Sequence, residues 1–555
     1  MNDHEGGAKH VRGGRSHIVI LGGGFAGVYT AMALERALDG RDDYEITLVN
    51  KENYFVFQPM LPEVISGSIG ITDLVSPIRS LLPHTDLHVR DIESVDLEGH
   101  EVRTSPGFKP HAHVIPWDHL VLALGTVTDF RGLPGLPEHA LPFKTLGDAL
   151  ALRNHVIRAL EEAAIERADP ELRRQLLTFV VAGGGFSGVE VVAELNDFVR
   201  GAARQYRGID PSEVRVFLLH SRDRILPEMD VSLALFAQKL LAKRGVEIRL
   251  GSRLEAATGY EAVLRGGERI PTRTLVSTVP ASPHPLIDSL ALPKAKNGRL
   301  LTTPELRVED QAAVWALGDC AVVTTRGGTV APPTAQHASR QSEVAAHNIV
   351  AALRGGTSRV FDFRGLGTMG SLGRRSAVAQ VFGFKLSGFV AWWVWRTVYL
   401  MKLPGWGRRL KVAVAWSLEL ILPPETVQLR VAGSKGLARE HYEPGQLVFR
   451  QGDLGDRLYI ILSGEAEVCR EDNAGESILA RLGAGQCFGE MALVQETTRN
   501  ASVRCARSMD VLSLPKQEFA VLAAYLPDLR QRFERLTEER SVEPPSGLDV
   551  SDRSG

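Results

Sequence analysis

The chain has 555 residues, which is enough for about three or four domains. Hydrophobic residues make up 44% and charged residues 23%, as in an ordinary globular protein, and the net charge of −2 gives no basic excess that would indicate nucleic-acid binding. The four cysteines, Cys320, Cys469, Cys487 and Cys505, have neither C-x-x-C nor zinc-ligand spacing. Their pattern argues against a disulfide framework or a metal site and suits a reducing cytoplasm.

The first ordered element is expected after residues 1–16, which are polar, rich in glycine and typical of a flexible tail. They contain no apolar segment of the kind that directs secretion. A strand is predicted over His17–Leu21, followed by GGGFAG, the helix-like run VYTAMALERAL and a second strand, YEITLVN. The order recurs in LLTFVVA, GGGFSG, VEVVAELNDF and VRVFLLH. This internal repeat predicts an α/β fold with two Rossmann-like dinucleotide-binding domains.

Both glycine-rich turns have the G-x-G-x-x-G spacing between a strand and a helix. The first glycine permits a tight turn, the second lets a pyrophosphate approach the backbone, and the third lets the helix pack on the strand. The free N–H groups at the helix start then face the anion. Glycines that serve only tight turns are the alternative, which two complete repeats make a weak one. The glycines are Gly22, Gly24 and Gly27 in the first turn and Gly183, Gly185 and Gly188 in the second.

The second strand of each repeat ends in an unusual residue. NAD-binding folds place an acidic residue there, but the first repeat ends at Asn50 and the second at His220. Asn50 can still bond a ribose hydroxyl, without charge. Without a carboxylate at His220, Ser221 and Arg222 could bind the 2′-phosphate of NADPH. Alternatively, Arg222 is a solvated loop charge and NADH binds with fewer contacts.

The stretch from residue 361 to 430 is rich in tryptophan and apolar residues. Leu386–Leu403 is long and apolar, but Arg396 and Lys402 interrupt it, and a charge in the middle of a bilayer is costly. Its tryptophans are residues of the membrane interface, so a helix lying in the interface is predicted. Leu410–Leu422 is a candidate second helix. A buried core helix or a homodimer interface competes with this interpretation.

The last part of the chain predicts a β-roll. Short alternating strands with glycine punctuation run from about Pro423 to Leu514, followed by a helix over Lys516–Glu539 and a disordered tail. Phe488–Val503 resembles the phosphate-binding cassette of cyclic-nucleotide-binding domains. Too little chain follows for a helix-turn-helix, which argues against DNA binding.

In that cassette the resemblance implies that Glu490 binds the ribose 2′-hydroxyl and Arg499 the cyclic phosphate, which suits a carboxylate acceptor and a planar guanidinium fork. Gly489, Asn500 and Ala501 complete the expected site. The ligand, cAMP or cGMP, stays open. A structural or dimerising module without ligand is the alternative.

Two further motifs indicate a family. Leu120–Thr126, with Gly125, looks like the crossing between two nested folds, and VWALGDCA, with Asp319, looks like the late FAD motif of two-dinucleotide-binding flavoproteins. NYFVFQPMLPEV, GGGFSGVE, APPTAQHASRQ and Gly365–Leu400 narrow the resemblance to type II NADH:quinone oxidoreductases. It covers roughly residues 17–430.

The resemblance implies roles for individual residues. Gln58 and Pro59 would be neighbours of the flavin and the quinone, Glu190 would lie at the flavin–nicotinamide contact, and Gln336 on the quinone route with Ala335 and Ala338. Gln58, Glu190 and Gln336 are the expected catalytic residues. Phe25, Asn50 and Lys51 belong to the expected FAD site, and Cys320 is expected to be a packed residue, because no second cysteine precedes Cys469. Glu190 and His337 are candidate proton donors. The family often has Gln where this chain has Arg340, with Gln341 one place later, and a one-residue step turns a side chain by about 100° around a helix.

The expected domains follow from these motifs. They are a tail (1–16), an FAD-binding domain in two parts (17–150 and 286–360), an inserted NAD(P)H-binding domain (151–285), membrane or dimer-contact helices (361–424), a cyclic-nucleotide-binding domain (425–539) and a second tail (540–555).

The function that the resemblance implies is FAD-dependent, non-pumping NAD(P)H:quinone oxidoreduction in a respiratory chain. The protein would be a peripheral homodimer on the cytoplasmic side of a bacterial inner membrane, with a membrane quinone as acceptor and a cyclic nucleotide as effector. NADH is the expected donor, and NADPH remains possible. Two alternatives stay open: a cyclic-nucleotide or redox sensor on a flavoprotein scaffold, and a soluble NADPH-dependent reductase with another acceptor.

Overall fold

The computed structural model describes residues 15–39, 41–105, 113–130, 132–278, 281–419, 427, 438–453, 457–472, 475–489 and 499–515. The expected tail before residue 15, the helix over Lys516–Glu539, the second tail and Glu490 lie outside these residues. The chain forms two compact units, one made of residues 1–131, 141–253 and 271–428 and one of residues 132–140, 254–270 and 429–555.

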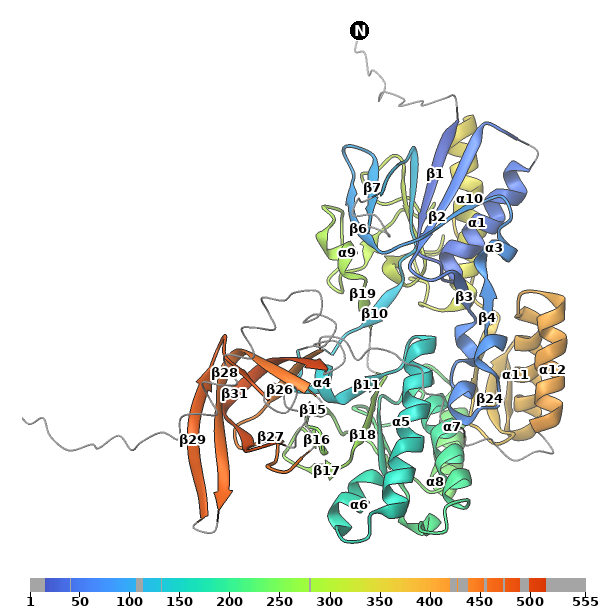
Figure 1. Cartoon of the computed structure of the whole chain (residues 1–555). Helices are drawn as coiled ribbons and strands as arrows, with labels where there is room; N and C mark the ends of the chain where they lie inside the picture. The colour runs from blue at the N-terminus through green and yellow to red at the C-terminus, as the bar shows by residue number, and fades with distance from the viewer. Residues whose placement is uncertain are drawn as a thin grey trace, which may run out of the picture. The chain divides into compact units, whose positions relative to one another are not determined.

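A five-stranded parallel sheet carries the first glycine-rich turn (Figure 1). Residues Ile18–Leu21 of its central strand are fully buried, as expected for a parallel strand covered on both faces. Helices α1 (Phe25–Leu38) and α10 (Ala335–Arg354) pack against each other beside this sheet. The strands, in spatial order, are β21 (Val314–Ala316), β9 (His119–Leu122), β1 (Ser16–Leu21), β2 (Tyr44–Asn50) and β5 (Asp86–Val89).

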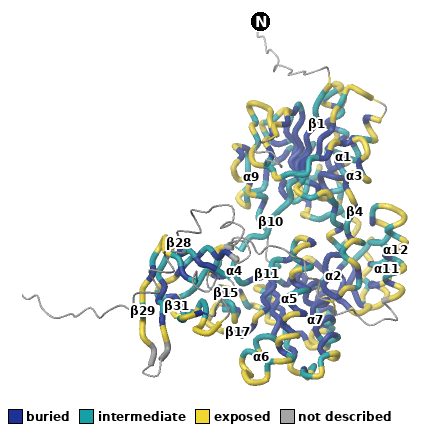
Figure 2. The backbone as a smooth tube through the Cα atoms, in the orientation of Figure 1, coloured by how far each residue is buried: buried dark blue, intermediate teal, exposed yellow. Residues whose placement is uncertain are grey.

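A second five-stranded sheet carries the second glycine-rich turn. All of its strands fall between β9 and β21 in the sequence, so the second dinucleotide-binding fold is nested within the first, as predicted. Figure 2 shows both sheets as buried segments. In spatial order the strands are β11 (Ala140–Pro142), β18 (Thr274–Ser277), β12 (Thr178–Ala182), β13 (Arg215–Leu219) and β14 (Val246–Arg249). The helices of this region are α5 (Leu146–Ile165), α6 (Pro170–Leu176), α7 (Phe186–Ala203) and α8 (Val231–Lys243).

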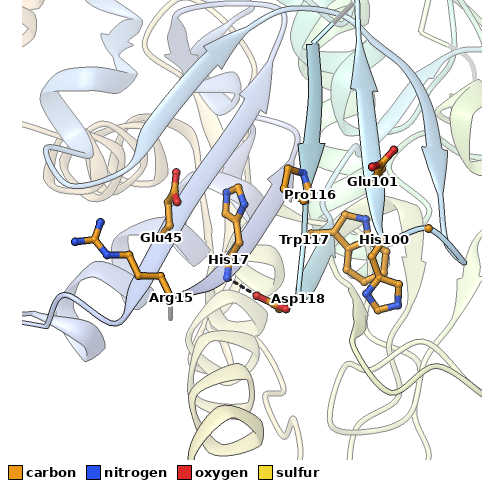
Figure 3. Close-up of a pocket in the computed structure, with 9 residues that line it drawn as sticks. Arg15, His17, Glu45, His100, Glu101, Pro116, Trp117 and Asp118 are labelled. Carbon is orange, nitrogen blue, oxygen red and sulfur yellow. Dashed lines mark hydrogen bonds between the residues drawn. The ribbon is translucent and has the colours of Figure 1, made fainter. Parts of the chain in front are cut away.

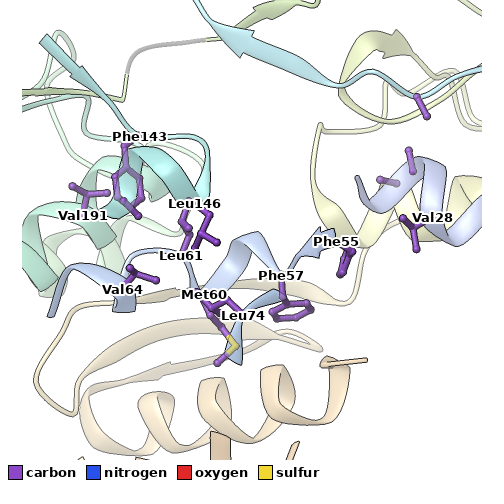
Figure 4. Packing of buried hydrophobic residues seen from close by; sticks show 14 of the residues in the cluster. Val28, Phe55, Phe57, Met60, Leu61, Val64, Leu74, Phe143, Leu146 and Val191 are labelled. Carbon is purple, nitrogen blue, oxygen red and sulfur yellow. The ribbon is translucent and has the colours of Figure 1, made fainter. Parts of the chain in front are cut away.

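Short elements complete the first unit. The most important is the excursion between β2 and β5, whose helix α2 (Glu63–Ser66) packs against α5 and α7. Figure 4 shows its apolar residues Leu61 and Val64 near Leu146 and Val191. The other elements are β3 (Tyr54–Val56), η1 (Gln58–Met60), η2 (Ile71–Asp73), β4 (Val75–Pro77), α3 (Ile78–Leu81), β6 (Ile92–Asp96), β7 (Glu101–Thr104), β8 (His113–Pro116), β10 (Thr126–Thr128), η3 (Pro211–Glu213), β19 (Ala281–Pro283), α9 (Pro285–Ser289), β20 (Leu300–Leu301), η4 (Gly318–Cys320) and β22 (Ala321–Val322).

An antiparallel sheet and two helices end the first unit. The sheet has the order β23 (Gly367–Ser371), β24 (Ala377–Val381), β25 (Phe384–Ser387). Helix α11 (Gly388–Lys402) occupies most of the predicted Leu386–Leu403 stretch, and α12 (Trp406–Glu419) begins four residues earlier than the candidate second helix. Among the residues placed in the structure, none belongs to a helix that is long and apolar enough to cross a membrane.

The second unit contains an antiparallel sheet with a core of its own. Tyr459, Ile461, Val503, Met509 and Val511 are central to that core. The strands are β26 (Ala438–Tyr442), β27 (Leu447–Phe449), β28 (Arg457–Asp472), β29 (Gly475–Gly483), β30 (Cys487–Phe488) and β31 (Ser502–Pro515). Helix α4 (Leu136–His139) and the three-stranded sheet β15 (Leu254–Ala257), β16 (Glu261–Leu264), β17 (Arg269–Pro271) belong to the same unit.

Helix α4 contacts strand β26 through a cluster of charged groups. Burial raises the pKa of Glu138, and one of its carboxyl oxygens has no hydrogen-bond partner among the described residues. The ring of His441 contacts Asp510 Oδ1 at 2.9 Å and Glu443 Oε1 at 3.1 Å. Although burial opposes them, these carboxylates raise the pKa of His441. The link between the two dinucleotide folds therefore packs within the same unit as the C-terminal sheet.

Candidate active site

The first glycine-rich turn has the geometry that a dinucleotide requires. Gly22 has φ +108°, and a Cβ there would lie 2.4 Å from the carbonyl oxygen of Ala123. A Cβ on Gly27 would lie 1.8 Å from the carbonyl oxygen of Gly22. Around Gly24, by contrast, no atom lies within 4 Å of such a Cβ, and no side chain caps α1. The open space and the free N–H groups at this helix start fit the pyrophosphate of FAD.

The second turn repeats this geometry. Gly183 has φ +125° with Thr278 against it, and a Cβ on Gly188 would lie 1.7 Å from the carbonyl oxygen of Gly183. Gly185 again faces open space, and α7 begins there without a side-chain cap. The residues present therefore fit a second dinucleotide as well as the first.

The two unusual strand ends perform the same task. Asn50 Oδ1 accepts a hydrogen bond from the N–H of Gly23 at 2.8 Å, and His220 Nδ1 accepts one from the N–H of Gly184 at 3.1 Å. Burial, and then the charge of Arg222, lower the pKa of His220, which favours the neutral ring that this bond needs. Each residue thus closes its own turn. Arg222 and Lys51 are exposed beside these strand ends.

The late FAD motif lies at the start of a short turn. Asp319 belongs to η4, and Gly318 donates its N–H to Gln341 Oε1 at 2.8 Å. Gln341 is buried, whereas Arg340 is exposed and pairs with Glu343 at 3.3 Å. The amide displaced by one residue relative to the family pattern therefore stabilises the turn that carries Asp319.

Cys320 belongs to this turn, and Lys144 is influenced by the charge of its Asp319. Cys320 is fully buried with its sulfur 3.3 Å from the carbonyl oxygen of Leu122, and burial raises its pKa to about 11. Such a thiol is inert. Lys144 contacts the hydroxyl of Thr126. Burial lowers the pKa of Lys144, and the charge of Asp319 opposes that shift. Sequence reasoning missed Lys144, since an isolated lysine between two folds carries no motif.

Aromatic rings shape the flavin side of the first turn. Phe25, at the start of α1, lies 4.9 Å from the ring of Phe55 and 5.7 Å from that of Phe57. Gln58 follows Phe57 and is exposed at the start of η1, and Gly125 takes φ +64° where the chain leaves β9. Phe57 in turn contacts Tyr399 of α11 at 6.0 Å, edge to face.

Strand β23 connects two predicted catalytic residues. Gln336 donates to the carbonyl oxygen of Gly367 at 3.0 Å and accepts from the N–H of Leu366 at 3.2 Å. At the other end of the strand, Ser371 donates its N–H to Glu190 Oε1 at 3.0 Å. A strand rises about 3.3 Å per residue, so these two anchors stand roughly 13 Å apart.

The environment of Glu190 favours a protonated carboxyl. Burial, followed by the negative charge of Glu63, raises its pKa to about 8, although the Ser371 N–H opposes the shift. The charge of Glu190 also acts on Tyr399, whose pKa is raised first by burial and then by that charge. The other candidate donor, His337, is buried against Thr334 Oγ1 at 2.7 Å and Phe363, and burial lowers its pKa.

The nucleotide cassette of the β-roll is described only in part. Gly489, Asn500 and Ala501 lie on either side of the undescribed stretch that contains Glu490. Arg499 is buried and donates to the carbonyl oxygens of Gly489 and Arg457 at 2.7 and 2.8 Å. Its guanidinium lies 4.1 Å from the ring centre of Phe449. Arg499, a residue of the cassette, is thus buried, and backbone carbonyl oxygens hold its guanidinium.

Helices α11 and α12 both carry exposed apolar side chains. On α12, Trp406, Leu410, Val414 and Leu418 recur every four residues and therefore share one face. We call the whole set the α11–α12 apolar face. It comprises Phe389, Val390, Trp393, Met401, Trp406, Leu410, Val414 and Leu418.

A small pocket lies elsewhere, at the opposite end of β1 (Figure 3). Arg15, His17, Glu45 and Asp118 line it, and the N–H of His17 donates to Asp118 Oδ2 at 2.7 Å. Dinucleotides bind at the carboxyl ends of parallel strands, so this pocket is not part of the site. Within the described residues, no group of three or more histidine, cysteine or acidic side chains is arranged to hold a metal ion.

Comparisons with known proteins agree with this geometry. The family model of the pyridine nucleotide-disulphide oxidoreductases matches residues 16–342, that of the NDH2 C-terminal domain residues 366–422, and that of the cyclic nucleotide-binding domain residues 439–525. Two curated relatives resemble most of the chain. The type II NADH:quinone oxidoreductase NdhA of Mycobacterium tuberculosis is 32% identical, covering 74% of this chain and 88% of that protein. The demethylphylloquinone reductase NdbB of Synechocystis is 33% identical, covering 72% and 96%.

A solved structure supports the same fold. The NDH2 of Plasmodium falciparum in complex with NADH superposes with a TM-score of 0.69 at 18% identity, covering 74% of this chain and all of that one. Two nested dinucleotide folds, a matching C-terminal segment and relatives above 30% identity lead to one conclusion. The chain belongs to the type II NADH:quinone oxidoreductases of the pyridine nucleotide-disulphide oxidoreductase family and carries a cyclic nucleotide-binding domain.

Proposed function

We propose that this chain oxidises NADH with bound FAD and reduces a membrane quinone, with Glu190 and Gln336 as the protein groups nearest the acceptor. The observation that carries this proposal is the double anchoring of β23, by Gln336 at one end and by Glu190 at the other. FAD, when bound, accepts a hydride and passes on two electrons. The protein's contribution is to orient both substrates and to supply a proton.

Each predicted cofactor residue has a task in this proposal. Gly24 and the start of α1 would bind the FAD pyrophosphate, and Asp319 would bond the ribityl chain from the turn held by Gln341. Phe25 and Gln58 would border the flavin, and Gly185 would leave room for the nicotinamide nucleotide. Because burial keeps the carboxyl of Glu190 protonated near neutral pH, Glu190 can act as a general acid toward a quinone oxygen.

One assay tests the function against its alternatives. Purified, FAD-loaded protein is mixed with NADH or NADPH, with and without a short-chain quinone. NADH oxidation that depends on the quinone supports the proposal. Flavin that neither donor bleaches would leave a sensor, and turnover with NADPH but without quinone would indicate a soluble reductase. The relative NdhA is named as a type II NADH:quinone oxidoreductase and the relative NdbB as a demethylphylloquinone reductase, which favours the first outcome.

We further propose that the α11–α12 apolar face binds the inner-leaflet membrane surface, from which the quinone enters. Trp393 and Trp406 on this face are residues of membrane interfaces, and they are 60% and 77% exposed. Arg408 and Lys411 lie next to them on α12 and suit anionic headgroups. A homodimer contact through the same face is the competing use. With the membrane use, the enzyme would lie on the cytoplasmic side of a bacterial inner membrane.

Flotation with vesicles separates these two uses. The doubly substituted W393S/W406S protein should lose binding to vesicles of anionic phospholipid while it remains folded. Deletion of Leu386–Leu422 should release the protein from native membranes. Binding that is unchanged in the double variant, together with conversion of a dimer to a monomer, would instead assign the face to dimerisation.

The C-terminal domain is proposed to bind a cyclic nucleotide through Arg499 and Glu490. The buried position of Arg499 beside the cassette supports this proposal, since a guanidinium in a sheltered site pairs strongly with a phosphate. Calorimetry with cAMP and with cGMP tests it, and R499Q provides the matched loss of charge. Neither heat nor a thermal shift with either nucleotide would refute binding.

A further inference from the structure

A buried carboxyl group accompanies the half-buried Glu190. Glu63 begins helix α2, is only 3% exposed, and accepts a hydrogen bond at Oε2 from the indole N–H of Trp416 at 2.9 Å. Trp416 lies 353 residues further along the chain, on helix α12, and is itself buried. Trp416 of helix α12 thus holds a carboxyl group of helix α2, which follows Phe57 and Gln58 in the sequence.

Glu63 and Glu190 belong to packed elements. Helix α2 packs directly on α7, which carries Glu190, and both helices contribute buried apolar residues to the same cluster, among them Val64 and Val191 (Figure 4). Burial is the main reason that the ionised form of Glu190 is disfavoured, and the charge of Glu63 adds to that effect. Two carboxyl groups that interact in a buried site do not both ionise readily, and together they retain a proton.

Other polar and charged residues lie on the elements around Glu63 and Glu190. Arg153 of α5 donates to the carbonyl oxygen of Ile65 at 2.8 Å, and the pKa of Tyr399 of α11, which burial raises, is raised further by the charge of Glu190. Arg396 of α11 stacks over the ring of Trp416 at 4.5 Å. Glu194, one turn after Glu190 on α7, is buried but is not among the charges that shift the pKa of Glu190.

We propose that Glu63 and Glu190 form one proton-sharing pair, in which Trp416 positions Glu63 and Glu63 keeps Glu190 protonated for quinone reduction. This inference rests on the proposed function of Glu190. Overall, NADH, one proton and a quinone give NAD⁺ and a quinol. The hydride supplies two electrons and one hydrogen nucleus. The O–H bond of Glu190 breaks as a quinol O–H bond forms, and water then returns a proton to the pair.

Glu63 is therefore a positioning residue, and its substitution should change a pH profile rather than the whole activity. In E63Q, loss of the negative charge lowers the pKa of Glu190, so the alkaline limb of quinone reduction moves to lower pH. At pH 8 the rate should fall by about tenfold, which is less than the roughly 100-fold or more that a complete loss of a general acid costs, because Glu190 itself remains. NADH:ferricyanide activity, which consumes no proton at the acceptor, should stay within about twofold. E63D should restore part of the wild-type profile.

The matched variants are W416F and two controls. W416F removes only the donor to Glu63 and should move the profile in part, whereas W117F changes another buried tryptophan and should not. E194Q removes a buried carboxyl on the same helix and should leave the profile unchanged. Infrared difference spectra give a readout without turnover, because the deuterium-sensitive band of a protonated carboxyl should change in both E63Q and E190Q.

Two results would overturn the pair. One is an E63Q protein that keeps the wild-type pH profile and infrared band. The other is an equal loss of quinone and ferricyanide activity in E63Q and W416F, which would indicate a purely structural contact. Failure of the proposed function has a different signature, because the unsubstituted enzyme would then reduce ferricyanide but not quinone. If E63Q does not retain FAD, the pH profiles and infrared bands of W416F and E63D are compared with those of the wild type instead.

Discussion

The two glycine-rich turns have almost the same backbone and different closing residues. In each, the first glycine takes a positive φ and the middle glycine faces open space. Asn50 closes the FAD turn and His220 the second turn, each by accepting a backbone N–H. The fold therefore needs an acceptor at this position, and either an amide or a neutral imidazole can supply it. Discrimination between NADH and NADPH depends on charge, which neither Asn50 nor a neutral His220 supplies. Arg222 is the candidate residue for it.

The largest expected effect comes from filling the open position of one turn. Gly185 has φ −78° and ψ −173°, values that valine tolerates, so G185V should fold and retain FAD. Its side chain would occupy the pyrophosphate position, and the KM for NADH should rise by about 100-fold or more, equivalent to about 3 kcal/mol of binding. Steady-state kinetics and the flavin spectrum measure both. G24V, the same change in the first turn, should instead lose FAD. Retention of FAD by G24V would show that the two turns do not play equivalent roles.

A smaller effect is expected from the charge beside His220. R222A should raise the KM for NADPH by about tenfold and that for NADH by less than about twofold, if Arg222 pairs with a 2′-phosphate. R224A is the matched control, because Arg224 donates to the carbonyl oxygen of Pro227 at 3.0 Å and so supports the loop itself. Equal changes for both donors in R222A would make Arg222 a solvated loop charge.

The smallest effect separates the two closing residues by pH. Burial lowers the pKa of His220 below the value it has in the unfolded chain, so the unfolded state takes up a proton first as the pH falls below about 6.5. The stability contributed by the neutral ring is therefore lost toward acid pH. H220N, which copies Asn50, should remove this part of the dependence, by about 1 kcal/mol at most. Urea titrations at pH 5.5 and 7.5 measure the free energy of unfolding of both proteins. The same change in this free energy between the two pH values in H220N and in the wild type would count against the prediction.

The nested folds were predictable because their signal is local. Strand, glycine spacing and helix start lie within about 30 residues of one another, and the structure repeats this frame twice. The motifs at Gln336 and Glu190 were also readable from the sequence, through family resemblance. Their anchoring on the two ends of β23 was not, because hydrogen bonds to backbone atoms leave no residue-type signature.

Other features depend on contacts between distant segments. Gln341 lies one place after the expected amide, and only the burial of that helix face reveals its bond to Gly318. Glu63 and Trp416 had no motif in common, since an acidic residue after proline and a tryptophan in an apolar helix each look ordinary alone. The start of α12 at Trp406 was missed for a similar reason: Gly405 and Gly407 on either side of it are poor helix formers.

The contact between α4 and β26 has a consequence for anyone who shortens this protein. Glu138 is kept partly out of water beside His441, Asp510 and Arg439, all of which belong to the C-terminal sheet. A chain that stops before residue 438 would return Glu138 and His139 to solvent and lower the pKa of the Glu138 carboxyl. Because these residues lie on the link between β10 and β11, trimming the C-terminal domain alters the passage between the two dinucleotide folds. The trimmed enzyme is therefore an altered form of the catalytic part, and its kinetics would not report the activity that this part has in the full chain.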